Sequence, residues 1–99
     1  MTTETFEPFD LAEYATGADT QAYLLEQALE SGDAGVLANA LGIIARARGM
    51  TQVAKDAGVT REALYKALTP EGDPKLSTLM GVIAALGLKL SVAPVDTKL

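Results

Sequence analysis

The sequence predicts a small all-α domain of about five helices, with an acidic N-terminal extension and a short C-terminal β-strand. Apolar residues recur at helical spacing in segments 19–33, 33–49 and 75–87, and as two short helices in 50–68. A glycine marks the end of most of these helices. Leu88–Val92 then alternates apolar with polar residues, which is the spacing of a strand. Ala, Leu, Val and Ile supply most of the apolar content of 48%, and this composition suits closely packed helices.

Capping residues and glycines set the expected helix boundaries. Asp19 is placed to cap the helix that ends near Gly32, and Asp33 to cap the helix that ends at Gly49. Gly42 lies inside that second helix, where glycine costs about 1 kcal/mol relative to alanine. We expect close packing of a neighbouring helix to account for this glycine.

The last helix and the strand complete the expected fold. The residues expected to face inward from segment 75–87 are Leu76, Leu79, Met80, Ile83 and Leu86. Pro94 closes the strand Leu88–Val92. Because the backbone of one strand needs a ladder partner, we expect pairing with the N-terminal arm, with a second subunit or with another protein.

The charge of the chain is unevenly distributed. The formal net charge is -5, yet residues 1–33 hold eight acidic residues and no Lys or Arg, whereas residues 34–99 hold all eight basic residues and five acids. The second part is therefore net basic. This asymmetry predicts two surfaces that favour partners of opposite charge.

Composition excludes several classes of function. The chain has neither cysteine nor histidine, so disulfides, thiolate metal sites, Cys nucleophiles and the commonest general base are absent. Without a Gly-rich phosphate loop or a nucleophile motif, we expect no enzyme, and we expect no cofactor or metal. No apolar run approaches the roughly 18 residues that span a membrane. The acidic N-terminus lacks the layout of a signal peptide, so we expect a cytoplasmic protein.

Residues 50–68, "MTQVAKDAGVTREALYKAL", have the pattern of a helix-turn-helix. Gly58 occupies the turn, where a left-handed backbone favours glycine. Ala54 is small enough for the second helix to cross closely. Thr51 and Thr60 are expected N-caps of the two helices. An ordinary pair of helices in a bundle is the alternative interpretation.

The second of these helices carries the candidate reading face for DNA. If Ala63, Leu64, Ala67 and Leu68 face inward, the outward residues are Thr60, Arg61, Glu62, Tyr65 and Lys66. Arg61 is the candidate for a bidentate guanine contact, and Glu62 for accepting from cytosine or for holding Arg61 in place. Tyr65 and Lys66 are expected on backbone or flanking bases. A solvated helix face remains the alternative for each of them.

From "ARARG" through "TREALYKAL" to "GDPKLSTLMGVIAALGLKLSVAP", the chain resembles the addiction module antidote protein family, HigA-like antitoxins of the Xre helix-turn-helix type. The similarity extends to "FDLAEYA" and "LLEQALESGD", nearly the whole chain. It implies a lambda-repressor-like domain that binds operator DNA as a homodimer and represses its own operon. It also implies a small basic toxin of RelE/ParE type as the partner of a type II toxin–antitoxin module.

One feature departs from the wider Xre pattern. Thr51 and Gln52 stand two residues closer to Gly58 than the usual Thr-Gln pair, so the first helix is shorter. In that group the Gln commonly braces a phosphate contact. Gln52 is therefore a weaker DNA-contact candidate than Thr51 or the residues of the second helix.

The acidic part is the candidate surface for the toxin. We divide the chain into residues 1–32, an acidic arm and helix for toxin binding, and 33–99, the DNA-binding domain with its strand. The aromatic residues among the acids are Phe6, Phe9, Tyr14 and Tyr23. They are candidate interface anchors, or they complete the core of the domain itself. The alternative functions are a stand-alone Xre regulator without a toxin, and a protein-interaction module that no longer binds DNA.

Overall fold

The computed structural model describes residues 17–95, and these form five helices. The helices are α2 (Ala18–Glu30), α3 (Ala34–Arg48), α4 (Met50–Ala57), α5 (Arg61–Ala67) and α6 (Leu76–Ala85). The all-α prediction is confirmed for this part of the chain. N-terminal residues 1–16 and C-terminal residues 96–99 lie outside it.

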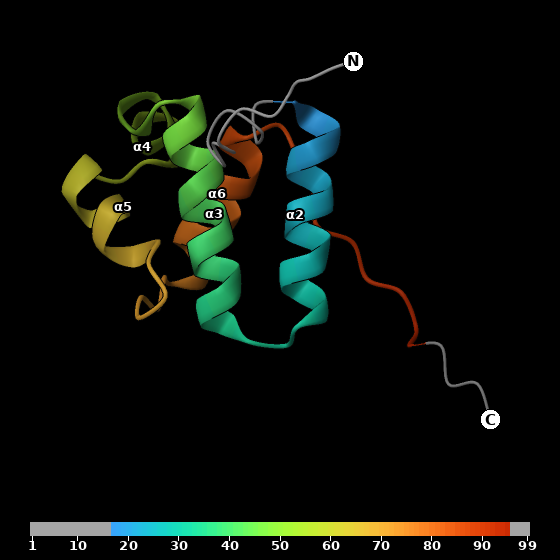
Figure 1. Cartoon of the computed structure of the whole chain (residues 1–99). Helices are drawn as coiled ribbons and strands as arrows, with labels where there is room; N and C mark the ends of the chain where they lie inside the picture. Colours follow the sequence, from blue (N-terminus) through green and yellow to red (C-terminus); the bar gives the residue numbers. More distant parts are fainter. Residues whose placement is uncertain (1–16, 96–99) are drawn as a thin grey trace, which may run out of the picture.

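The helices surround one apolar core. Helices α2 and α3 run antiparallel beside each other, and α4 and α5 lie on the other side of α3 from α2 (Figure 1). Helix α6 packs against α4. The largest fully buried apolar side chains come from α3, from α5 and the residue after it, and from α6 and the residue after it: Leu41, Ile44, Leu64, Leu68, Val82 and Leu86. Leu25 of α2 joins the same core cluster.

Helix starts follow the capping prediction at one boundary and not at another. The Asp33 carboxylate accepts hydrogen bonds from the backbone N–H of Gly35 at 2.8 Å and of Val36 at 3.3 Å, so it caps α3 as predicted. The predicted cap at Asp19 is wrong, because α2 is capped at Gly17 without a side-chain bond. Asp19 lies in the first turn, where its charge still favours the helix dipole.

Two glycines allow helices to approach closely. A Cβ atom at Gly42 would overlap the carbonyl oxygen of Leu68, which explains the glycine inside α3. A Cβ at Gly81 would lie 2.9 Å from the carbonyl oxygen of Ala57 at the end of α4. The expected close packing at Gly42 is therefore present, and α6 meets α4 in a similar way.

The inward face of α6 differs from the predicted one. Val82, Ile83 and Leu86 are buried, but Leu76 is 69% exposed and Met80 is 59% exposed. The ten residues of α6 carry no charge, and their only polar side chains, Ser77 and Thr78, lie near its start, so the sequence marks a solvent face weakly. Contact with α4 through Gly81 turns Leu76 and Met80 outward.

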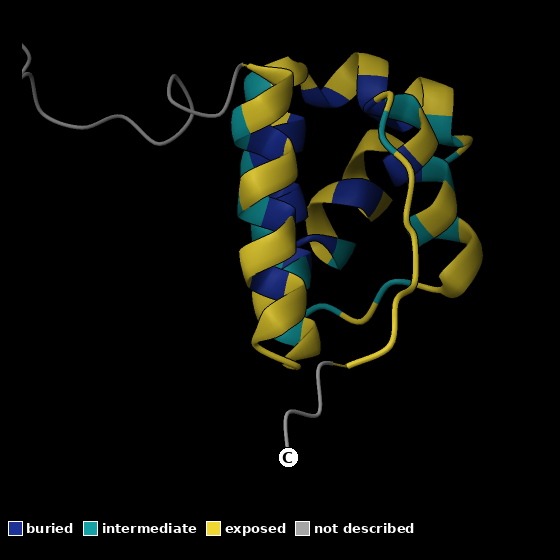
Figure 2. Ribbon diagram, turned by 90° about the vertical axis from the view of Figure 1, so that its right-hand side faces the viewer, coloured by how far each residue is buried: buried dark blue, intermediate teal, exposed yellow. Residues whose placement is uncertain are grey.

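The segment that follows α6 does not form the predicted strand in the single chain. Residues 88–95 have neither helical nor strand structure, and their residues from Lys89 onward are exposed. Figure 2 shows this segment as a yellow strip running beside the helices. Leu88 donates its backbone N–H to the carbonyl of Ile83 at 3.1 Å, and no backbone hydrogen bond joins Lys89–Val95 to other described residues. The partner for this segment is thus not supplied by residues 17–95.

The five described helices, and the acidic residues on and between them, exclude two further features from residues 17–95. None of these helices has the length and apolar composition needed to cross a membrane. Within residues 17–95, no group of acidic side chains is arranged to hold a metal ion.

Candidate nucleic-acid interface

Helices α4 and α5 form a helix–turn–helix pair whose turn follows from three local features. Gly58 ends α4 in the left-handed conformation, with φ 77° and ψ 27°, as its position predicted. The backbone N–H of Val59 donates to the carbonyl of Ala54 at 3.0 Å. The Thr60 hydroxyl accepts from the backbone N–H of Ala63 at 3.0 Å and caps α5, which confirms that prediction.

The inner side of the pair is closely packed. Val53 and Ala54 of α4 are buried, and so are Leu64 at the centre of α5 and Leu68 just after it. Ala63 is exposed, so its predicted inward position is wrong. Because alanine is small, its exposure leaves room for an approaching molecule beside the longer side chains of α5.

The candidate reading residues lie together on the exposed side of α5. Arg61, Glu62, Tyr65 and Lys66 are all exposed. The guanidinium carbon of Arg61 lies 5.5 Å from the centre of the Tyr65 ring, within the range of a cation–π interaction. Among the described residues, Tyr65 is thus a neighbour that can orient Arg61, and the role of Glu62 stays a prediction. Arg61 keeps its fork of N–H donors available to an acceptor.

The two candidates on α4 have different environments from those expected. The predicted cap at Thr51 is wrong, because α4 begins at Met50 after Gly49 and Thr51 lies within its first turn. The Gln52 amide donates to the Asp56 carboxylate at 2.9 Å, one helical turn further on. Gln52 is thus engaged with an acidic neighbour, while Thr51 is exposed.

Arg48 has a structural role that the sequence pattern did not reveal. Its guanidinium donates to the Gln21 side-chain oxygen at 3.1 Å and to the carbonyl of Leu86 at 2.6 Å. It therefore ties α2, the end of α3 and the end of α6 together. Gln21 is fully buried. A polar residue on the apolar side of α2 needs a buried hydrogen-bond partner, and this position could have indicated a contact such as the one with Arg48.

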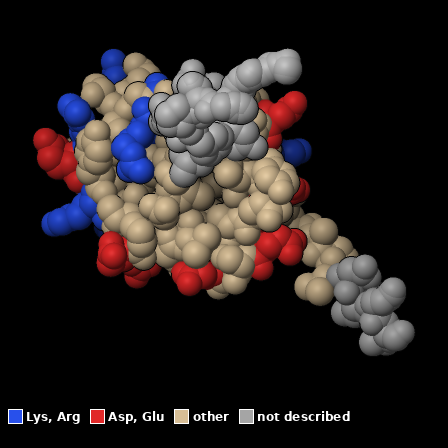
Figure 3. Space-filling model, in the orientation of Figure 1, with Lys and Arg blue, Asp and Glu red and all other residues tan. Residues whose placement is uncertain are grey.

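The remaining cations favour the side of the molecule that carries α4 and α5. In Figure 3, most Lys and Arg atoms on the visible face lie over this side, whereas Asp and Glu atoms line the lower edge and the α2 side. Arg46, Lys55, Arg61 and Lys66 are exposed near the pair, against Asp56 and Glu62. The charge asymmetry of the sequence is thus also an asymmetry of this surface.

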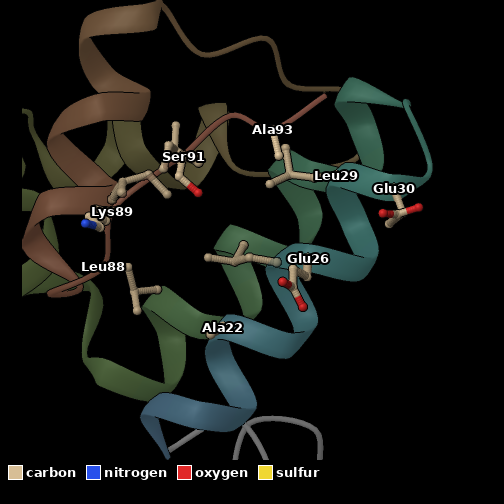
Figure 4. Close-up of a pocket in the computed structure, with 11 residues that line it drawn as sticks. Ala22, Glu26, Leu29, Glu30, Leu88, Lys89, Ser91 and Ala93 are labelled. Carbon is tan, nitrogen blue, oxygen red and sulfur yellow. The ribbon is translucent and has the colours of Figure 1, made fainter. Parts of the chain in front are cut away.

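Helix α2 provides a second, acidic surface. A groove of about 370 Å³ lies between α2 and the segment after α6 (Figure 4). Its α2 wall includes Ala22, Leu29, Glu26 and Glu30, and the other wall includes Leu88. Leu29, which is 47% exposed, is a candidate contact that the sequence interpretation missed. The sequence feature that could have indicated this contact is the position of Leu29 beside the acidic residues of α2.

The aromatic candidates are only partly described. Tyr23 lies on α2 and is 54% exposed, so it is available as an interface residue. Phe6, Phe9 and Tyr14 lie outside the described residues. Their role stays a prediction.

The fold and site define a small helical domain with a helix–turn–helix pair. The second helix of the pair exposes polar side chains, and one of them, Arg61, stacks on the ring of Tyr65. The chain belongs to a family described as "Probable addiction module antidote protein", whose model matches residues 5–94. It is 43% identical over 90 residues to an uncharacterized protein of Haemophilus influenzae, with 91% of this chain and 93% of the relative covered. No solved structure matches the chain. The family supports an antitoxin role with a toxin as partner.

Proposed function

We propose that the chain is the antitoxin of a type II toxin–antitoxin module. It neutralises a RelE/ParE-type toxin, binds operator DNA as a homodimer and represses its own operon. Membership of the antidote family supports the antitoxin part. The DNA-binding part rests on one observation, the Arg61–Tyr65 pair on the exposed side of the second helix of a helix–turn–helix.

The Arg61–Tyr65 pair suits base recognition for a physical reason. An arginine that stacks on an aromatic ring loses less side-chain freedom when it binds, because the ring already restricts it. Its guanidinium then donates two parallel hydrogen bonds to O6 and N7 of guanine in the major groove. Lys66 and Thr51 supply contacts to phosphates, which position the helix without reading sequence.

Toxin binding is assigned to the acidic surface. Helix α2 carries Asp19, Glu26 and Glu30 and no basic residue. Exposed Tyr23 and Leu29 add apolar contact area among these acids. A small basic toxin complements this combination, since aromatic and aliphatic anchors give affinity and opposite charges speed encounter. We place Phe6, Phe9 and Tyr14 in the same interface.

Operator binding by Arg61→Ala tests the DNA assignment. We expect the dissociation constant for DNA from the promoter of the chain's own gene to rise about 10- to 100-fold, the usual effect of losing a bidentate base contact. Fluorescence anisotropy at several salt concentrations measures this. Arg61→Lys keeps the charge but loses the guanidinium fork, so it serves as the matched control that separates a base contact from a general effect of charge. Equal binding by Arg61→Ala and wild type at every salt concentration would contradict the assignment.

Co-expression with the protein of the adjacent reading frame tests the toxin assignment. Growth arrest by that protein should be relieved by the wild-type chain and less well by the Glu26→Lys, Glu30→Lys double variant, because it reverses charge at the groove. Glu71→Lys, an acid in the loop between α5 and α6, is the control. If the wild-type chain gives no relief, the antitoxin proposal fails. If both variants relieve arrest equally, only the location of the interface is wrong.

A further inference from the structure

The outer side of α6 is an uncharged apolar stripe that residues 17–95 leave uncovered. Leu76, Met80 and Ala84 are exposed and recur every four residues, so they share one side of the helix. No residue between Leu76 and Ala85 is charged. Apolar stripes on the surface of a small domain indicate a contact with another molecule.

A groove opens at one end of this stripe. It has a volume of about 290 Å³ and is lined by Met80, Ile83, Ala84, Leu88, Lys89 and Leu90. At the other end of the stripe stands Leu76, which is 69% exposed. The stripe thus has a projecting side chain four residues before Met80 and a hollow around the residue four after it.

We propose that a second copy of the chain covers this stripe, with two α6 helices packed antiparallel about a two-fold axis at Met80. In that arrangement each Leu76 faces Ala84 of the other copy and enters its groove. The contact is isologous, since the same projection and the same hollow occur on both copies. A large side chain meets a small one at each end, which is how packed helices interdigitate.

Charge favours a second copy over the other candidate partners. Among residues 17–95, Lys89 is the one charged residue that lines the groove, and the acids that suit a basic toxin lie on α2. DNA needs several cations, and α6 has none. Two uncharged helices, by contrast, meet without repulsion. This inference rests on the homodimer of the proposed function and gives it a surface. A dimer that forms through another surface would overturn the inference and leave the proposed function standing, whereas a monomeric chain would contradict both.

Sedimentation equilibrium of the full chain tests the proposal. We expect wild type to dimerise between about 1 and 100 μM, and Met80→Glu to raise the dimer dissociation constant more than about tenfold because it places two carboxylates at the axis. Val36→Glu puts the same charge at an exposed apolar site on α3 and is the matched control. Circular dichroism checks that each variant is folded. A wild-type chain that stays monomeric, or a Met80→Glu dimer as tight as wild type, would overturn the proposal.

A size exchange tests the pairing of Leu76 with Ala84. Leu76→Ala removes the projection and Ala84→Leu fills the hollow, so each should weaken the dimer. The double variant restores one large and one small residue at each contact, and we expect it to recover much of the lost affinity. A double variant no tighter than either single variant would overturn the antiparallel register.

Cysteine cross-linking gives a second measurement of the axis. The chain has no cysteine, so Met80→Cys creates a single thiol at the proposed axis. We expect mild oxidation to form a disulfide-linked dimer of Met80→Cys much faster than of Ser31→Cys, a control in the exposed turn after α2. Equal rates of cross-linking for the two variants would place the axis elsewhere.

Discussion

The α4–α5 pair and α6 use their apolar residues in opposite ways. In the pair, the large aliphatic side chains Val53, Leu64 and Leu68 are buried within the chain. Helix α6 buries Val82 and Ile83 but leaves Leu76 and Met80 exposed. The large aliphatic residues of the pair are therefore packed within one chain, whereas the outer side of α6 has exposed apolar residues that a partner could bury. The buried residues of the pair therefore stabilise the fold, whereas the exposed residues of α6 are available for contact with a partner.

Truncating one leucine of the pair and one exposed residue of α6 should give the largest difference in the free energy of unfolding. Leu64 is fully buried, so Leu64→Ala should lower the free energy of unfolding by about 2–5 kcal/mol through lost burial and a cavity. Met80→Ala, at a site 59% exposed, should cost less than about 1 kcal/mol. Urea unfolding at low protein concentration measures both. Similar losses for the two variants would mean that the outer side of α6 is part of the fold.

The fit between α3 and the end of α5 should give a smaller effect. Gly42→Ala raises intrinsic helix propensity by about 1 kcal/mol, but its Cβ would overlap the carbonyl oxygen of Leu68. A backbone atom cannot move aside cheaply, so we expect a net loss of about 1–3 kcal/mol. Thermal denaturation followed by circular dichroism measures the change. A rise in melting temperature would show that propensity outweighs the contact.

The smallest expected effect compares two threonines within the pair. Thr60→Ala removes the hydroxyl that caps α5 and should cost about 1 kcal/mol. Thr51→Ala changes an exposed residue inside the first turn of α4, so it should stay within about 0.5 kcal/mol of wild type. Thr60→Ser, which keeps the hydroxyl, is the control. Chemical denaturation separates these variants, and an equal loss for Thr51→Ala and Thr60→Ala would contradict the capping geometry.

Sequence interpretation succeeded where a residue acts on its own backbone. Gly58 in the turn, Thr60 at the start of α5 and Asp33 at the start of α3 each have the role that their type and position predicted. The caps predicted at Asp19 and Thr51 are wrong because their helices begin earlier, at Ala18 and Met50. A residue caps a helix only if it stands just before the first helical residue. A polar residue in the first turn looks the same in the sequence, so the pattern does not distinguish the two positions.

The candidate site was predictable in its residue types and less so in its contacts. Arg61, Tyr65 and Lys66 are exposed on α5 as the sequence predicted, because Leu64 and Leu68 fix which side of this short helix is buried. The stacking of Arg61 on Tyr65 follows from their spacing of four residues, yet Glu62 was an equal candidate to hold Arg61. Only side-chain geometry distinguishes the two.

The sequence by itself determined the helices, the turn at Gly58 and the division between acidic and basic parts, because these depend on neighbouring residues and on composition. The tertiary structure decided which side of α6 faces the core, because this helix has no charged residue and its polar residues, Ser77 and Thr78, lie only near its start. Tertiary structure also decided that Arg48 reaches Gln21 and Leu86, residues distant from it in the sequence. It likewise left Lys89–Val95 without a backbone partner in residues 17–95, since a strand needs a neighbour that its own sequence does not supply.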